Sequence, residues 1–190
     1  LFLVDCVTSL GGMDVRMDAW YIDAIYSGTQ KCLSCPPGLS PISFSDQAIT
    51  KLSNRKSKVP NWYLDVSLLT QYWSGNSRVY HHTAPINMLY GLYQACYNIL
   101  DEGLDAVIMR HRSMHSLLVE ELNSIGLDLF VEKSIRLPML NAVRIPASVN
   151  ESEVRNRLLR EYRIEIGGGL GPLAGKIWRI GLMGETAKKE

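Results

Sequence analysis

The sequence has no long hydrophobic run and almost no charge imbalance, and both absences narrow its function. None of its apolar stretches approaches the roughly 20 residues that a membrane-spanning helix needs, and Leu1 to Val4 is too short for the core of a signal peptide. Twenty basic and nineteen acidic residues leave a formal net charge of +1, which would not attract nucleic acid or an anionic membrane. We therefore expect a soluble protein that acts on small molecules, with no nucleic-acid or membrane partner.

Cysteine is also scarce, with four residues in a chain of 190. That is too few for a disulfide framework, so we expect free thiols and a reducing compartment. Cys32 and Cys35 form a single C-x-x-C pair without a second pair at zinc spacing, which argues against a metal site. The rings of His81 and His82 would point apart in an extended segment, which suits packing or hydrogen bonding better than metal binding. We predict no bound metal.

The composition suffices for a folded core, because 46% of the residues are hydrophobic and 21% are charged. The two ends look interrupted. Leu1 to Val4 is typical of a buried strand without a preceding turn, and Glu185 to Glu190 is typical of the first turn of a helix. We expect the chain to be a piece of a longer protein.

Two short apolar runs, residues 1–5 and 24–28, predict neighbouring strands of an α/β sheet that is buried on both faces. A crossover of about a dozen or more residues would place them side by side. Ligand sites in such sheets gather at the carboxyl ends of the strands, which is where Asp5 and residues 27–31 fall.

Prolines, serines and basic residues between Pro36 and Val79 predict loops and short elements, with a solvated basic face made of Lys51, Arg55, Lys56 and Lys58. Thr83 and Pro85 then precede an apolar series that Gly103 closes, which predicts a capped amphipathic helix.

The remaining chain predicts a small α/β unit that begins near residue 103. A helix is expected from about Asp105 to Gly126, and another through Tyr162 with Asn150 and Glu153 as its cap. Four segments have the pattern of strands: 127–131, 141–145, 164–166 and 176–182.

Lys31 stands in a constrained setting, just after the second predicted strand and before Cys32. Taken alone, a lysine is most often exposed at the surface. A lysine at a sheet edge of low dielectric can instead lose its proton and form a Schiff base with an aldehyde cofactor. Asp5 would share the same crevice, where a carboxylate can keep a pyridine nitrogen protonated; the alternative for Asp5 is a helix or turn cap.

Five motifs follow one another along the chain: residues 4–12 (VDCVTSLGG), 27–31 (SGTQK), 36–38 (PPG), 80–83 (YHHT) and 168–172 (GGLGP). In this order they resemble the alanine–glyoxylate (serine–pyruvate) aminotransferases, which are class V pyridoxal-phosphate aminotransferases. The resemblance covers nearly the whole chain. It implies the α/β type I fold of pyridoxal-phosphate transferases, with residues 1–102 as the carboxyl-terminal part of the large cofactor-binding domain and 103–190 as a truncated small domain.

The resemblance also implies roles for particular residues. Lys31 would carry pyridoxal 5'-phosphate as a Schiff base, Asp5 would bind its pyridine nitrogen, and Gln30 would contribute to the phosphate site. Tyr80 and Thr83 would donate hydrogen bonds to the phosphate of the neighbouring subunit's cofactor, so the active unit would be a homodimer with shared active sites.

Arg179, in Trp178-Arg179-Ile180-Gly181, matches the arginine that binds the substrate carboxylate through two parallel hydrogen bonds. Without the resemblance, a surface arginine at a strand edge would be the simpler interpretation. The glycine-rich residues 167–171 resemble a phosphate loop but lack the Gly-Lys-Ser/Thr ending, so we interpret them as a backbone turn near the substrate.

The implied activity is transfer of an amino group from alanine or serine to glyoxylate, with an amino acid and a keto acid as substrates. The insect 3-hydroxykynurenine transaminases share these motifs, including residues 178–185, and remain an alternative. A lyase like the cysteine desulfurases is disfavoured because Gln30 rather than histidine precedes Lys31, and a non-catalytic folding or dimerisation fragment stays open. Family habit implies a peroxisomal location, with mitochondrial and cytoplasmic alternatives.

Overall fold

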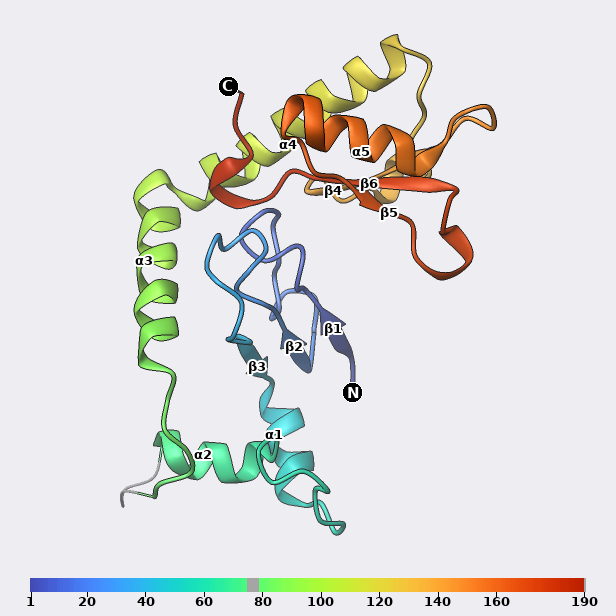
Figure 1. Cartoon of the computed structure of the whole chain (residues 1–190). Coiled ribbons are helices and arrows are strands. Elements are labelled where there is room, and N and C mark those ends of the chain that lie inside the picture. The colour runs from blue at the N-terminus through green and yellow to red at the C-terminus, as the bar shows by residue number, and fades with distance from the viewer. Residues whose placement is uncertain (75–78, 190) are drawn as a thin grey trace.

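The computed structural model describes residues 1–74 and 79–189. The protein has the mixed α/β architecture that the sequence predicts. Figure 1 shows a small sheet near the amino terminus and a second one near the carboxyl terminus, with two long helices, α3 and α4, in the connection between them. None of the helices in the described ranges has the length and apolar character to span a bilayer.

The first sheet contains β1 (Leu3–Asp5), β2 (Ala24–Tyr26) and β3 (Ile42–Phe44), in that order. β1 and β2 are parallel, with Asp5 opposite Tyr26, so the predicted neighbouring strands are confirmed. The antiparallel strand β3 was not predicted. Burial on both faces was also wrong for β1, because Leu3 is 65% exposed: no other layer of the described chain covers it.

The segment predicted as loops contains two helices as well as β3: α1 (Asp46–Ser53) and α2 (Val66–Ser74). α1 begins where the hydroxyl of Ser45 accepts a hydrogen bond from the backbone of Ala48. Both helices are short, so their apolar residues do not complete a periodic pattern. The basic stretch is exposed, as predicted. Residues 75–78 of this prediction lie outside the described residues.

α3 (Ile86–Glu102) and α4 (Leu104–Ser124) meet at Gly103, whose φ of 90° suits a residue without a side chain. The predicted helix between Pro85 and Gly103 is confirmed, but the predicted side-chain cap is absent. The helix begins after Pro85 without a side-chain cap, and the Thr83 hydroxyl instead contacts Tyr80. The predicted apolar face of α3 is exposed in the single chain, at Ile86, Leu89, Tyr90, Tyr93, Tyr97 and Leu100.

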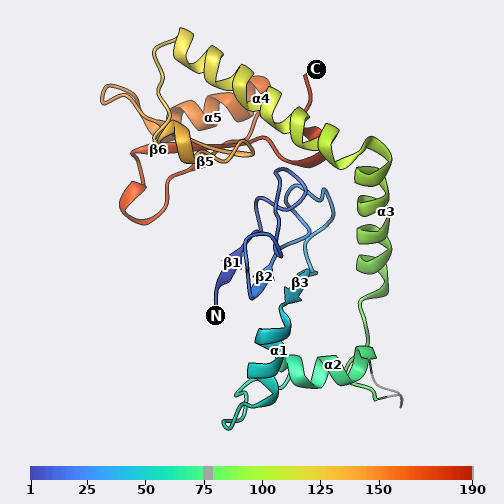
Figure 2. The ribbon, with the colours of Figure 1, turned by 180° about the vertical axis from the view of Figure 1, so that it is seen from behind.

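The second sheet is antiparallel, in the order β4 (Leu140–Arg144), β6 (Ile177–Gly181), β5 (Gly167–Gly168). α5 (Glu151–Tyr162) and part of α4 pack on one face of it, as both views show (Figures 1 and 2). Burial of each large apolar side chain here contributes about 1.5–3 kcal/mol. The buried core is Leu122, Leu129, Val143, Ile166 and Trp178.

The predicted cap of α5 is confirmed, because Asn150 Oδ1 accepts hydrogen bonds from the backbone of Ser152 and Glu153. The predicted strands at 141–145 and 176–182 are confirmed as β4 and β6. Residues 127–131 do not form a strand, since only Leu129 makes an isolated bridge, to Val143.

The strand predicted at 164–166 does not form there, and the extended segment is instead β5, at residues 167–168. Arg163 closes α5 in the left-handed conformation, and the N–H of Ile164 still bonds back to Leu158, so the extended pairing starts later. Short 3₁₀ turns complete the chain: η1 (Lys133–Ile135), η2 (Gly171–Leu173) and η3 (Gly184–Thr186). The helix predicted to begin at Glu185 does not form over residues 185–189, where only the end of the η3 turn is helical. Glu190 lies outside the described residues. The domain boundary near residue 103 stays a prediction.

The glycine-rich segment is only in part the predicted backbone turn, because Gly167 and Gly168 form β5 and a 3₁₀ turn begins at Gly171. Gly169, between them, is the most constrained position of the segment. A Cβ atom there would lie 2.0 Å from the carbonyl oxygen of Leu173, a backbone atom that no rotamer change can move. We expect Gly169→Ala to lower the free energy of unfolding by about 3 kcal/mol, the upper end for overpacking. Gly175→Ala is the matched control, because a Cβ there meets open space and costs only about 1–2 kcal/mol of left-handed strain. Urea denaturation compares the two, and equal losses would contradict the prediction.

Candidate active site

The loops that follow β1 and β2 lie together, as expected for neighbouring parallel strands. The backbone N–H of Cys6 donates to the Tyr26 carbonyl at 2.9 Å, and the buried Ser27 hydroxyl donates to the Cys6 carbonyl at 3.1 Å. Further along, the Cys32 thiol donates to the Thr8 carbonyl at 3.2 Å. Hydrogen bonds thus join the two loops on both sides of Lys31, the candidate nucleophile.

Both carboxylate oxygens of Asp5 accept hydrogen bonds. Oδ1 accepts from the backbone of Val7 at 2.8 Å, so the turn cap considered for this residue is present. Oδ2 accepts from the Tyr26 hydroxyl at 2.8 Å, because directly opposite residues of neighbouring strands project to the same face. This hydrogen bond raises the pKa of Tyr26, so the phenol stays protonated and remains a donor. Sequence reasoning missed Tyr26, since its role depends on the register.

Lys31 lies half-buried in a closed turn of the chain. The N–H of Ser34 donates to the Lys31 carbonyl at 3.0 Å, and the fully buried Thr29 donates its hydroxyl to the Pro36 carbonyl at 2.7 Å. Within the described part of the chain, the Lys31 amine makes no hydrogen bond or ion pair. Gln30 is exposed beside it. The backbone of this loop is fixed while its amine is left available for chemistry.

Tyr80 and Thr83 are brought together, with their hydroxyl oxygens 2.7 Å apart, and Tyr80 is 67% exposed. The rings of His81 and His82 do not point apart, because their Nδ1 atoms are 2.8 Å from each other. That expectation was wrong since residues 79–85 form no strand, so the alternation of side chains does not apply. His81 also stacks on Trp62 at 4.1 Å, a contact without any signal in the sequence.

The structure does not bring this hydroxyl pair to Lys31. Tyr80 and Thr83 precede α3, whereas Ser34 lines a small cavity with Asn98 and Glu102 near the other end of that helix. A helix of 17 residues is about 25 Å long at 1.5 Å per residue. In Figure 1 the loops that follow β1 and β2 lie toward the α4 end of α3, whereas the segment that precedes α3 lies at its opposite end, beside α2. One cofactor cannot contact both groups of the same chain.

Arg179 lies on β6 and is partly buried. Its Nε donates to the Gly168 carbonyl at 2.7 Å, and within the described residues its two Nη atoms make no hydrogen bond. Gly167 is its cross-strand partner, and a Cβ there would lie 3.3 Å from Nη2, so the missing side chain leaves room for the guanidinium. The anchored Nε leaves the two Nη atoms for a carboxylate.

All four cysteines are free thiols. Burial raises the pKa of Cys6, Cys32 and Cys96, so these thiols stay protonated near neutral pH. A protonated buried thiol is a poor nucleophile. The described residues contain no group of three or more His, Cys, Asp and Glu side chains placed to hold a metal ion.

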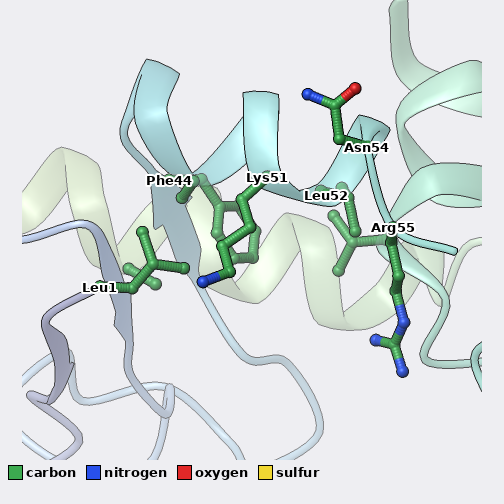
Figure 3. A pocket seen from close by; sticks show the side chains of 9 residues that line it. Leu1, Phe44, Lys51, Leu52, Asn54 and Arg55 are labelled. Atoms are coloured by element: carbon green, nitrogen blue, oxygen red, sulfur yellow. The ribbon is translucent and has the colours of Figure 1, made fainter. Parts of the chain in front are cut away.

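A separate cavity of about 530 Å³ lies at the opposite end of the first sheet, where β1 and β2 begin. Figure 3 shows Leu1 and Phe44 on its walls, with Lys51 and Arg55 beside them. It contains no carboxylate, hydroxyl or thiol side chain, and it lies away from Asp5 and Lys31. We therefore do not assign the chemistry to it.

Three findings relate the chain to known proteins. The class-V aminotransferase family matches residues 1–176. The chain is 43% identical over 191 residues to an alanine–glyoxylate aminotransferase of Drosophila melanogaster, covering 99% of this chain and 48% of that protein. It is 38% identical to an (S)-ureidoglycine–glyoxylate transaminase of Bacillus subtilis, covering 100% of this chain and 50% of that protein.

A solved structure of an alanine–glyoxylate aminotransferase from a Nostoc species is similar over 100% of this chain and 50% of that one, with a TM-score of 0.95 and 53% identity. The chain thus spans about half the length of the relatives that it matches. A structure of a cysteine desulfurase from Thermococcus onnurineus is similar with a TM-score of 0.70 at 14% identity, which shows the shared fold alone.

Proposed function

Since this chain belongs to the class-V aminotransferases, we propose that the whole protein transfers an amino group from an amino acid to glyoxylate with pyridoxal 5'-phosphate. The type I fold expected from the sequence is confirmed by the similarity to solved aminotransferases. The observation that carries the proposal is the placement of Asp5 at the carboxyl end of β1 and of the unpaired Lys31 amine in the loop after the parallel strand β2, with hydrogen bonds joining the loops that follow the two strands.

Glyoxylate is supported as the acceptor, because it appears in the names of two relatives whose named amino donors differ, alanine in one and ureidoglycine in the other. Alanine is the proposed donor, on the strength of 53% identity to the Nostoc enzyme. Ureidoglycine is the second candidate, since a B. subtilis structure of that specificity is 41% identical over 99% of this chain. Serine and 3-hydroxykynurenine stay alternatives from the sequence.

The residues present fit the proposed cofactor. An unpaired amine suits an aldehyde, a carboxylate with two fixed oxygens suits a protonated ring nitrogen, and a pair of exposed hydroxyls suits a phosphate. When bound, the cofactor supplies an electron-accepting ring that stabilises negative charge at the substrate's Cα. The corresponding groups in this chain are Lys31, Asp5, Tyr80 and Thr83.

Each side chain then has a physical task. Lys31 Nζ would hold the cofactor's aldehyde, and the same amine is placed to take the proton from the substrate's Cα. Asp5 is held in one orientation, because Val7 and Tyr26 donate to its two oxygens. Arg179 binds the substrate carboxylate through its Nη atoms and so fixes the direction of the Cα–H bond.

The active site is shared between two subunits in this proposal. Its support is the length of α3, which separates the Tyr80 and Thr83 hydroxyls from the Lys31 loop of the same chain. The exposed apolar face of α3 also needs a covering surface. A homodimer with two equivalent sites accounts for the separation of these hydroxyls from Lys31, because the Tyr80 and Thr83 hydroxyls of each subunit then serve the lysine of the other subunit.

The test is an assay of the full-length protein with glyoxylate and one amino donor at a time, measuring the glycine formed. The donors are alanine, serine, ureidoglycine and 3-hydroxykynurenine. We expect the highest kcat/KM with alanine. A higher value with another donor would replace alanine as the substrate, and no glycine from any donor by a cofactor-loaded protein would contradict the proposed function.

Hybrid dimers test the sharing of the site. One inactive parent carries Tyr80→Phe with Thr83→Ala, which removes both hydroxyls, and the other carries Arg179→Ala. If these residues serve opposite sites, a mixed dimer contains one intact site, and statistical pairing restores about a quarter of the wild-type activity. Activity and cofactor content are measured after co-expression. Absence of recovered activity, with both parents folded and dimeric, would place Tyr80 in its own subunit's site.

A further inference from the structure

The turn at residues 184–187, called the 184–187 turn below, is held by groups from two distant parts of the chain. On one side, the N–H of Glu185 donates to the Ser34 hydroxyl at 2.7 Å. On the other side, Arg110 of α4 donates to the carbonyls of Gly184 at 2.7 Å and Ala187 at 3.2 Å. The turn therefore joins α4 to the loop that contains Lys31.

His111 completes this attachment from the interior. Its side chain is fully buried, its Nδ1 lies 2.8 Å from the Val107 carbonyl, and its Nε2 lies 2.9 Å from the Gly184 nitrogen. One neutral tautomer satisfies both contacts, with Nδ1–H donating to Val107 and Nε2 accepting from Gly184. Burial lowers the pKa of His111, which keeps this neutral form.

Ser34 has a strained, left-handed backbone conformation at the same place. Among residues 1–74 and 79–189, only three non-glycine residues have a positive φ, and Ser34 is one of them at 56°. Such strain persists where surrounding contacts fix the backbone, and it concentrates at functional sites. Gly184 is fitted to this position, because a Cβ there would lie 1.9 Å from the Ser34 oxygen.

These contacts lie between Lys31 and Arg179. The proposed function assigns the reactive amine to Lys31 and the binding of the substrate carboxylate to Arg179. Ser34 is three residues from Lys31, and its N–H closes the turn on the Lys31 carbonyl. Glu185 is six residues beyond Arg179 and four residues beyond the end of β6. The hydrogen bond from Glu185 to Ser34 is thus a short path between the two.

We propose that Ser34 is a positioning residue, which holds the Lys31 loop against the 184–187 turn and so sets the place of the Lys31 amine relative to Arg179. The inference rests on the proposed function. Displacement of a reacting group by about 1 Å can cost about 100-fold in rate, so even a partial shift is measurable. Ser34 does not itself touch the reacting atoms.

The test compares two variants of the full-length protein. Ser34→Gly removes the hydroxyl but suits the left-handed backbone, so folding is preserved. Ser34→Asn tolerates the same backbone and restores an acceptor oxygen. Thr186→Ala is the matched control, because its hydroxyl lies in the same turn but bonds only to the Met183 carbonyl.

We expect Ser34→Gly to lower kcat about tenfold with a smaller change in KM, at unchanged cofactor content and melting temperature. Ser34→Asn should recover most of the loss, and Thr186→Ala should behave as the unaltered enzyme. A Ser34→Gly enzyme with unchanged kcat would overturn the inference, as would failure of Ser34→Asn to restore it.

Amide hydrogen exchange separates this inference from the proposed function. Ser34→Gly should speed exchange at residues 29–35 and 184–187 while the core of the second sheet stays protected. Unchanged exchange in these segments would overturn the positioning role even if the enzyme transaminates. If the unaltered protein shows no transamination, the proposed function fails, and faster exchange in Ser34→Gly would still show that the hydroxyl holds the loop.

Discussion

Lys31→Ala in the full-length protein is expected to lower turnover by about 10³-fold or more, because the variant loses both the nucleophile and the group that moves the Cα proton. The backbone of the loop should remain in place, since its hydrogen bonds come from Thr29, Ser34 and Cys35. Borohydride reduction of the unaltered enzyme followed by peptide mapping should find the pyridoxyl group on Lys31.

Lys51→Ala is the matched control for this experiment. Lys51 is an exposed lysine beside the cavity of Figure 3, at the opposite end of the first sheet, so its loss should leave turnover unchanged. Discovery of the pyridoxyl group on another lysine, or near-normal turnover in Lys31→Ala, would show that the assignment is wrong.

Asp5→Asn is expected to keep the cofactor but to lose about 10²- to 10³-fold in turnover. An amide can still accept the hydrogen bond from Val7, but it carries no charge to hold a protonated ring nitrogen. Visible absorption reports the bound cofactor, and the glycine assay reports turnover. Tyr26→Phe, which removes only the donor to Oδ2, should have a smaller effect of about fivefold.

Asp23→Asn is the control for loss of a carboxylate from the same sheet. Asp23 accepts hydrogen bonds from the Phe2 backbone and the Ser45 hydroxyl at the far end of the strands. Its replacement should lower stability without a specific loss of turnover. Near-normal turnover in Asp5→Asn would mean that Asp5 is only the turn cap that its Oδ1 contact represents.

The neighbouring positions of the loops that follow β1 and β2 could be predicted from the sequence because parallel strands end at a common edge. The contact of Asp5 with Tyr26 could not, since it depends on a register that no local pattern encodes. α1 and α2 were missed for a different reason. They have 8 and 9 residues, and helices of that length are stabilised mainly by tertiary packing rather than by their own periodicity.

The pairing of Tyr80 with Thr83 follows from their spacing in the motif, but their distance from Lys31 does not. That distance depends on the straight course of α3, which only the structure supplies. Ser34 and Gly184 have no sequence signal that connects them, because the contact between their segments joins residues 151 positions apart.

The separation of 151 residues between Ser34 and Glu185 also orders events during synthesis. A ribosome adding about 5–20 residues per second needs about 8–30 seconds to travel between them. Closing so long a loop costs chain entropy of about 4 kcal/mol, which other contacts must offset first. The Cys32–Thr8 hydrogen bond joins residues only 24 positions apart, so its partners are available long before residue 185, whereas the Lys31 loop can gain its anchor at Glu185 only after that residue has emerged.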